Sequence, residues 1–132
     1  MVRRARIGWT LAVAAAAAGC TAQPPALAPV TGRVTFAGAP ITCGINVFSP
    51  DADSGCRGAC ASGEIGPDGR YTLVTDNQPG AVPGWHRVTV AALSAGYGPR
   101  LPERFREPAR SRLRAEVRAG QSNQIDFKLE GP

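Results

Sequence analysis

The segment GPDGRYTLVT, residues 66–75, carries the clearest structural signal in the chain. Its Asp68-Gly69 pair is a strong turn signal, because glycine accepts a positive φ without steric cost. After this pair, Tyr71 and Leu73 alternate with polar residues, which is the two-residue period of a strand that buries one face. The segment therefore predicts a turn that leads into a half-buried β-strand.

The same alternation recurs in short segments on both sides of this turn. We predict further strands in VTGRVTF, GINVFSP, ACASGEI, WHRVTVAA, LRAEVRAG and NQIDFKLE, which start at residues 30, 44, 59, 85, 113 and 123. Seven strands in about 100 residues, separated by turns with glycine and proline, are typical of a small β-sandwich. The sequence therefore predicts one all-β domain over residues 30–130.

The N-terminus has the features of an export signal. Three arginines at positions 3, 4 and 6 precede an apolar run from Ile7 to Gly19. This run of 13 residues is shorter than the roughly 20 that a membrane-spanning helix needs. We therefore predict a cleaved signal peptide over residues 1–19, followed by a Pro-rich tether over residues 20–29.

The sequence AAGC at residues 17–20 resembles the lipobox of bacterial lipoproteins. The resemblance implies that Cys20 is diacylated and becomes the first residue of the mature chain. The alternatives are a secreted chain cut near Ala22 and an uncleaved anchor. The predicted location is a lipid anchor in the cell membrane or outer membrane, with the domain facing the periplasm or the exterior.

Much of the positive charge belongs to this export signal. The full chain has a net charge of +5, and residues 1–19 contain three of its 15 basic residues. The mature chain then has 12 basic residues against 10 acidic ones, a net charge near +2. The composition therefore does not indicate a nucleic-acid partner.

The order of several motifs resembles the carboxypeptidase regulatory-like domain. These motifs are TGRVTFAGAPI, VFSP, GEIGPDGRYTL, GAVPGWHRVTV and the closing segment LPERFREPARSRLRAEVRAGQSNQIDFKLE. The family implies a seven-stranded, transthyretin-like or Ig-like sandwich and a non-catalytic module without cofactors. Its hydroxyisourate hydrolase branch carries several histidines and ends in Tyr-Arg-Gly-Ser, whereas this chain has one histidine and ends in KLEGP. We therefore expect no enzyme activity.

Three cysteines remain after Cys20, and export permits disulfides. In a hairpin of the second and third strands, Cys43 would lie more than about 15 Å from Cys56, too far for a bridge. We predict a disulfide between Cys56 and Cys60, with Cys43 as a free thiol. A redox pair and a zinc site with His86 are alternatives, although the spacings match no common motif of either kind.

Two further features have structural interpretations. His86 shares the parity of the apolar Val88 and Val90, so we predict that it points inward with a structural role. The acidic segment DADSG, residues 51–55, lacks the spacing of a calcium-binding loop, and we interpret it as a solvated turn. No serine, histidine and carboxylate stand in the arrangement of a catalytic triad.

The region from Arg100 to Arg118 is rich in positive charge, with seven arginines against three glutamates. Such a region attracts anionic glycans, lipid headgroups or acidic proteins. A candidate contact surface combines aromatic side chains and nearby arginines: Trp85, Tyr97, Phe105, Arg104 and Arg106. The hypothesis is a lipid-anchored envelope protein with a structural or protein-binding role, and the alternative is a carbohydrate-binding module that uses Trp85. The expected partners are thus the membrane and an envelope protein or glycan.

Overall fold

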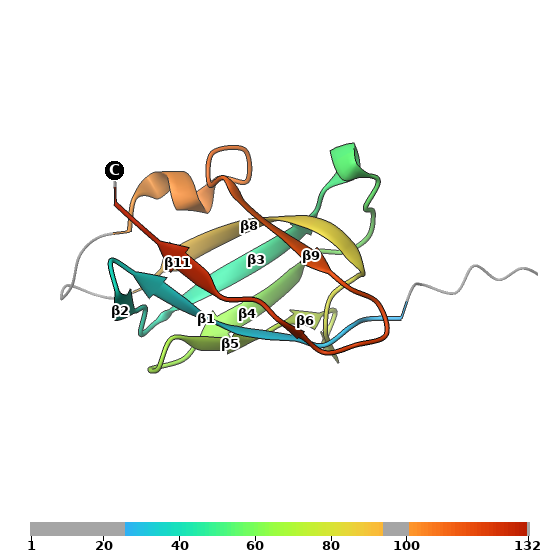
Figure 1. The fold of residues 1–132 in the computed structure, drawn as a ribbon, viewed down its shortest axis with the longest axis horizontal. Helices are drawn as coiled ribbons and strands as arrows, with labels where there is room; N and C mark the ends of the chain where they lie inside the picture. The colour runs from blue at the N-terminus through green and yellow to red at the C-terminus, as the bar shows by residue number, and fades with distance from the viewer. Residues whose placement is uncertain (1–25, 94–100, 132) are drawn as a thin grey trace, which may run out of the picture.

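Two β-sheets make up the part of the chain that the computed structural model describes, residues 26–93 and 101–131 (Figure 1). This arrangement confirms the predicted all-β sandwich. The predicted signal peptide, Cys20 and Tyr97 lie outside the described residues. Ala28, in the last part of the predicted tether, already belongs to the fold, since it is buried and bridges to Ala81.

The smaller sheet is built around β1 (Val30–Phe36). This strand pairs in parallel with the two last strands of the chain, β10 (Asn123–Gln124) and β11 (Phe127–Leu129). It pairs in the antiparallel sense with β2 (Ala39–Pro40) and β5 (Arg70–Thr72). The beginning and the end of the domain are therefore held in one sheet.

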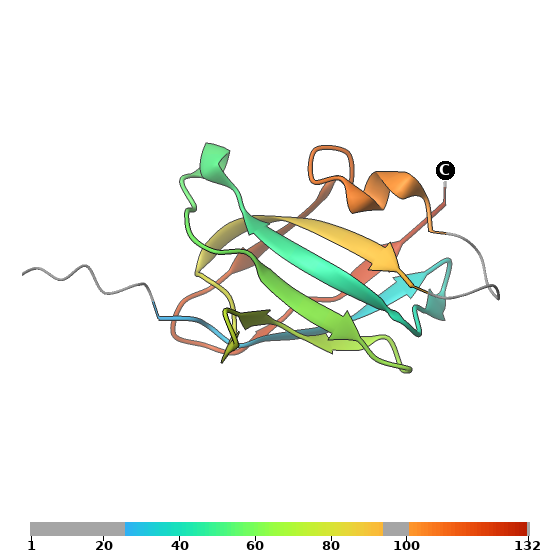
Figure 2. The same cartoon turned by 180° about the vertical axis from the view of Figure 1, so that it is seen from behind.

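The larger sheet is antiparallel and contains the longest strand of the domain, β8 (Gly84–Ala92) (Figure 2). Its spatial order is β7 (Gln78–Pro79), β6 (Val74–Thr75), β4 (Ala61–Ile65), β3 (Gly44–Pro50), β8 and β9 (Leu113–Val117). Two 3-10 helices lie in the connections, η1 (Ala52–Ser54) between β3 and β4 and η2 (Glu103–Arg106) between β8 and β9.

The described residues contain eleven strands, and each of the seven predicted segments contributes to them. Two of the additional strands, β2 (Ala39–Pro40) and β7, lie outside the predicted segments, and the other two arise because two predicted segments are each divided into two strands. In segment 66–75, β5 pairs with β1, whereas β6 pairs with β4. The closing segment is likewise divided, because Ile125 and Asp126 separate β10 from β11.

The Asp68-Gly69 turn forms as predicted. The Gly69 amide donates to the Gly66 carbonyl at 2.9 Å, and Gly69 has a φ of +82°. Beyond the turn, Tyr71 and Leu73 are buried, which confirms their predicted inward direction. The turn therefore sets which face of β5 enters the core.

The core lies between the sheets and is centred on Phe48 of β3. The centroid of its ring lies 5.8 Å from that of Phe127 and 6.3 Å from that of Tyr71. His86 contributes the other ring at 5.8 Å and is fully buried, so its predicted inward position is confirmed. The two sheets thus meet through aromatic side chains of four different strands.

Gly32 of β1 makes room for the C-terminal segment. The Tyr71 hydroxyl donates to the Ile125 carbonyl oxygen, and the Ile125 amide donates to the Thr31 carbonyl at 2.8 Å. A Cβ atom at Gly32 would overlap that Ile125 oxygen and would lie 2.8 Å from the Tyr71 hydroxyl. The segment can approach β1 this closely only because position 32 has no side chain.

We predict that Gly32→Ala lowers the free energy of unfolding by about 3 kcal/mol or more, because backbone atoms must separate to admit the methyl group. The matched control is Gly38→Ala, where a Cβ meets nothing within 4 Å but φ is +84°. The control should cost only about 1 kcal/mol of backbone strain. Urea unfolding measures both values, and equal losses would contradict the role of close approach.

Candidate functional site

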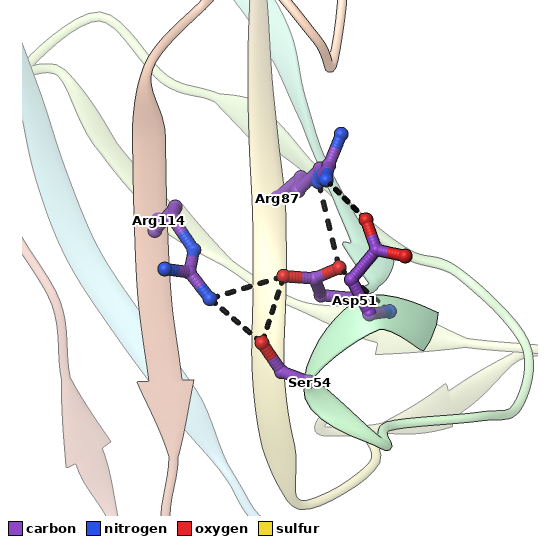
Figure 3. A network of polar contacts seen from close by, with 5 residues as sticks. Asp51, Ser54, Arg87 and Arg114 are labelled. Atoms are coloured by element: carbon purple, nitrogen blue, oxygen red, sulfur yellow. Dashed lines mark hydrogen bonds and ion pairs between the residues drawn. The ribbon is translucent and has the colours of Figure 1, made fainter.

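A cluster of ion pairs joins η1 to the exposed sides of β8 and β9 (Figure 3). Asp51 follows β3 directly and caps η1, accepting hydrogen bonds from the Asp53 amide at 3.1 Å and the Ser54 hydroxyl at 3.0 Å. Arg87 of β8 and Arg114 of β9 face each other in the register of the sheet. The capped turn therefore places a carboxylate between two arginines that face each other across the strands.

Both arginines contact Asp51. Arg114 Nη2 lies 3.0 Å from Asp51 Oδ2 and donates to Ser54 Oγ at 2.8 Å. Arg87 Nε lies 3.5 Å from Asp51 Oδ1, and its Nη2 donates to Asp53 Oδ2 at 2.8 Å. The Asp51 side chain is only 5% exposed. One shielded carboxylate thus offsets the repulsion between like charges on neighbouring strands.

The pKa of Asp51 reflects this environment. Burial by itself raises the pKa of the carboxyl, but the Ser54 and Asp53 hydrogen bonds and the charges of Arg87 and Arg114 outweigh it. The net result is a pKa below the ordinary value of 3.8. The interpretation of segment 51–55 as a solvated turn is therefore wrong for Asp51, although Asp53 is exposed. The capping pattern of an aspartate followed three residues later by a serine was the signal that could have shown it.

Trp85 lies beside this cluster on the exposed side of β8. Its side chain is 40% exposed, and the Arg114 guanidinium carbon lies 5.0 Å from the centroid of its ring. Its backbone carbonyl accepts a hydrogen bond from the Asp51 amide at 2.9 Å. Trp85 therefore remains a contact candidate, held next to two arginines by the same turn.

Phe105 does not belong to an exposed contact surface, and that prediction is wrong. Its side chain is 3% exposed and packs into the core from η2. Arg104 covers the ring, with its guanidinium carbon 4.5 Å from the ring centroid, and Arg106 is exposed. One turn of 3-10 helix points the aromatic ring inward while its charged neighbours stay at the surface. Trp85 is exposed and Phe105 is buried, so the two rings do not form one contact surface.

The predicted disulfide between Cys56 and Cys60 is not formed, and both residues are free thiols. Their sulfur atoms have different neighbours. Cys56 is buried, and its thiol donates to the Pro83 carbonyl at 3.5 Å. Cys60 is exposed, and its thiol lies 3.6 Å from the Ser49 hydroxyl. The turn of η1 holds Cys56 in place, since the Cys56 amide donates to the Asp51 carbonyl. Cys43 is a free, exposed thiol.

The structure gives no support to the zinc alternative. His86 Nε2 lies 2.7 Å from the Val82 carbonyl oxygen inside the core. Within residues 26–93 and 101–131, no three side chains of the histidine, cysteine, aspartate or glutamate type come together in a metal-binding group. The Asp51 carboxylate already accepts from arginine and hydroxyl donors. The cluster therefore links the η1 loop to the larger sheet.

The fold and this site define a two-layer β-sandwich in which a capped loop is pinned to the larger sheet. Comparison with known proteins gave no match to a family model, to a curated protein or to a solved structure. In the described ranges, no helix has the length and apolar character needed to cross a bilayer.

We predict that Asp51→Asn changes how stability depends on pH. Because the folded-state pKa of Asp51 is lowered, its charge stabilises the folded state above the ordinary pKa and loses this effect as the pH falls through the folded-state value. The difference in unfolding free energy between parent and variant should therefore be constant above about pH 5 and should shrink below about pH 4. Urea unfolding across this range measures it.

The control is Glu64→Gln, since Glu64 is exposed and makes no ion pair with another described residue. The difference in unfolding free energy between the parent and Glu64→Gln should not show the decrease below about pH 4 that is expected for Asp51→Asn. A parent-to-variant difference for Asp51→Asn that stays constant down to about pH 2 would contradict the proposed electrostatic role.

Proposed function

We propose that this chain is a non-catalytic, lipid-anchored protein of the cell envelope, of the carboxypeptidase regulatory-like type, that binds an envelope protein. The observation that carries the binding role is the exposed face of the larger sheet. The anchor rests on the lipobox-like AAGC at residues 17–20, and the family type rests on the motif order and the sandwich fold.

The exposed face of the larger sheet, called the outer face below, carries apolar side chains on β3 and β6, which lie on either side of β4. Ile45 of β3 is 37% exposed and Val74 of β6 is 38% exposed. Between these strands, Ser62 pairs with both Val47 and Val74 in the register. Small side chains of β8 continue the face on the other side of β3. Large apolar side chains that are exposed on one face of a sheet favour contact with another protein.

The outer face also contains a hollow. It has a volume of about 630 Å³ and lies where β4 and β6 approach β5. Ile45 and Val74 line it together with the charged Glu64 and Arg70. An apolar centre with charged residues around it is the usual composition of a protein interface.

The second candidate function is carbohydrate binding, and the exposure of Trp85 beside Arg87 and Arg114 favours it. An aromatic ring with adjacent polar donors is suited to stack on a sugar. Phe105 is buried and does not extend this surface. The carbohydrate hypothesis therefore depends on Trp85, whereas the protein-binding hypothesis depends on Ile45 and Val74.

We predict that the mature protein extracted from membranes has the mass of residues 20–132 plus acyl chains. Alkylation after unfolding without a reductant should modify three thiols, because Cys43, Cys56 and Cys60 are free. In the folded protein, Cys56 should react at least about tenfold more slowly than the exposed Cys60, because burial raises the pKa of the Cys56 thiol and hinders access. Mass spectrometry reports all three results.

An unacylated chain that begins after Cys20 would contradict the anchor. A peptide pair linked through Cys56 and Cys60 before reduction would instead contradict the free thiols. The two results are independent, so either can fail without the other.

We predict that a photo-crosslinking residue at Ile45, introduced into the full chain in cells, forms one defined adduct with an envelope protein. The same residue at Lys128, which is exposed on β11 of the other sheet, is the control. Val74→Asp should abolish the adduct, because it places a charge in the apolar face. Adducts of equal yield at positions 45 and 128 would contradict the proposal. Retention on polysaccharide that is lost in Trp85→Ala but kept in Val74→Asp would favour the carbohydrate alternative.

A further inference from the structure

Three arginines from separate positions line one hollow near the C-terminal end of the described chain. The hollow has a volume of about 330 Å³ and is formed by Arg104, Ala109, Arg110 and Arg112. These residues come from η2, from the turn that follows it and from the residues just before β9. No acidic residue lines the hollow.

Arg104 is held in a defined position. Its Nη2 donates to the Glu130 carbonyl at 3.0 Å, and its guanidinium lies over the buried Phe105 ring. The bond to Glu130 uses one of the five N–H donors that a guanidinium carries. The Nε atom of Arg104 is buried, so only N–H groups of the two terminal nitrogens can reach a ligand. Because the ring and the C-terminal backbone fix this side chain, such a contact costs little side-chain entropy.

The backbone around Arg110 and Arg112 is also fixed. The Ser111 amide donates to the Glu107 carbonyl at 2.8 Å, and the buried Ser111 hydroxyl donates to the Val88 carbonyl at 2.6 Å. Arg112 follows with a φ of +58°, a left-handed conformation that is unfavourable for a residue with a side chain. An arginine therefore stands at a position where glycine would fit better, and the hydrogen bonds of Ser111 hold the backbone there.

The charges of this hollow are incompletely balanced. Arg110 pairs with Glu107, with 3.2 Å between Nη1 and Oε2, but both side chains are more than half exposed. Arg104 and Arg112 make no ion pair with a described carboxylate. A bound anion with several oxygen atoms would relieve the repulsion among the three guanidinium groups.

We propose that this arginine hollow is a binding site for a phosphate group. Guanidinium donors match phosphate oxygens in bidentate geometry, and three arginines line this one hollow. The phosphate can belong to a soluble phosphorylated molecule or to a lipid headgroup, because both present the same oxygen atoms. The site lies apart from the ion pairs of Asp51 and from the outer face, and it does not depend on the proposed anchor.

The test is calorimetric titration of the purified full chain with inorganic phosphate at constant ionic strength. The variant is Arg110→Gln combined with Arg112→Gly, since glycine removes a charge and also relieves the left-handed strain, so that loss of folding does not explain loss of binding. We expect the variant to bind phosphate at least about tenfold more weakly. The control is Arg118→Gln, because Arg118 pairs with Glu116 and does not line the hollow. The control should leave the affinity within about twofold of the parent.

A second measurement identifies the source of the phosphate. Parent and variant are sedimented with vesicles of phosphatidylglycerol and phosphatidylcholine and with vesicles of phosphatidylcholine alone. Because both proteins share one N-terminus, a difference between them on the anionic vesicles reports the hollow and assigns it to headgroups. Binding of inorganic phosphate without such a difference assigns it to a soluble phosphorylated molecule. Equal behaviour of parent and variant in both measurements would overturn the site.

Discussion

The parallel pairing of the first strand with the last two strands holds the smaller sheet together. β1 is the partner of β2, β5, β10 and β11, so the sheet depends on this one strand. The pairing requires the C-terminal segment to lie directly against Gly32, where the Tyr71 hydroxyl and the Thr31 carbonyl hold Ile125. A contact between residues more than 90 positions apart, such as the Arg33 amide with the Asp126 carboxylate, closes a long loop and therefore costs chain entropy. The buried aromatic cluster that spans both sheets compensates for that cost.

Local features of the sequence were sufficient to predict the strands and the principal turn. Alternation placed β1 and β3 with the bounds that the structure has, and Asp68-Gly69 marked the turn before β5. The change of sheet at Leu73 was not predictable in this way, because inward parity is the same on both sides of it. Parallel pairing of the chain ends was equally hidden, since no short motif encodes a partner so far along the chain.

The polar site was harder to predict than the fold because its parts are distant in sequence. Asp51 and Arg114 are 63 positions apart, and only the register of β8 with β9 brings Arg114 beside Arg87. The errors at Phe105 and Cys56 have a related origin. Each lies in a short irregular segment, where one turn decides whether a side chain enters the core, and where no periodicity exists to be read. His86, on a regular strand, was placed correctly for the converse reason.

The proposed anchor, the outer face and the arginine hollow belong to different parts of the domain, so one contact at each does not exclude the others. The described chain begins at one end of the long axis, whereas η2 and the C-terminus lie towards the other end (Figures 1 and 2). An anchor at Cys20 would therefore hold the domain from the end away from the arginine hollow, and the outer face would remain accessible along the side of the sandwich. Residues 20–132 contain 12 basic residues against 10 acidic ones, so Arg104, Arg110 and Arg112 create a local rather than a global positive field. A local field directs an anion to one end of the molecule without drawing the whole domain onto an anionic surface.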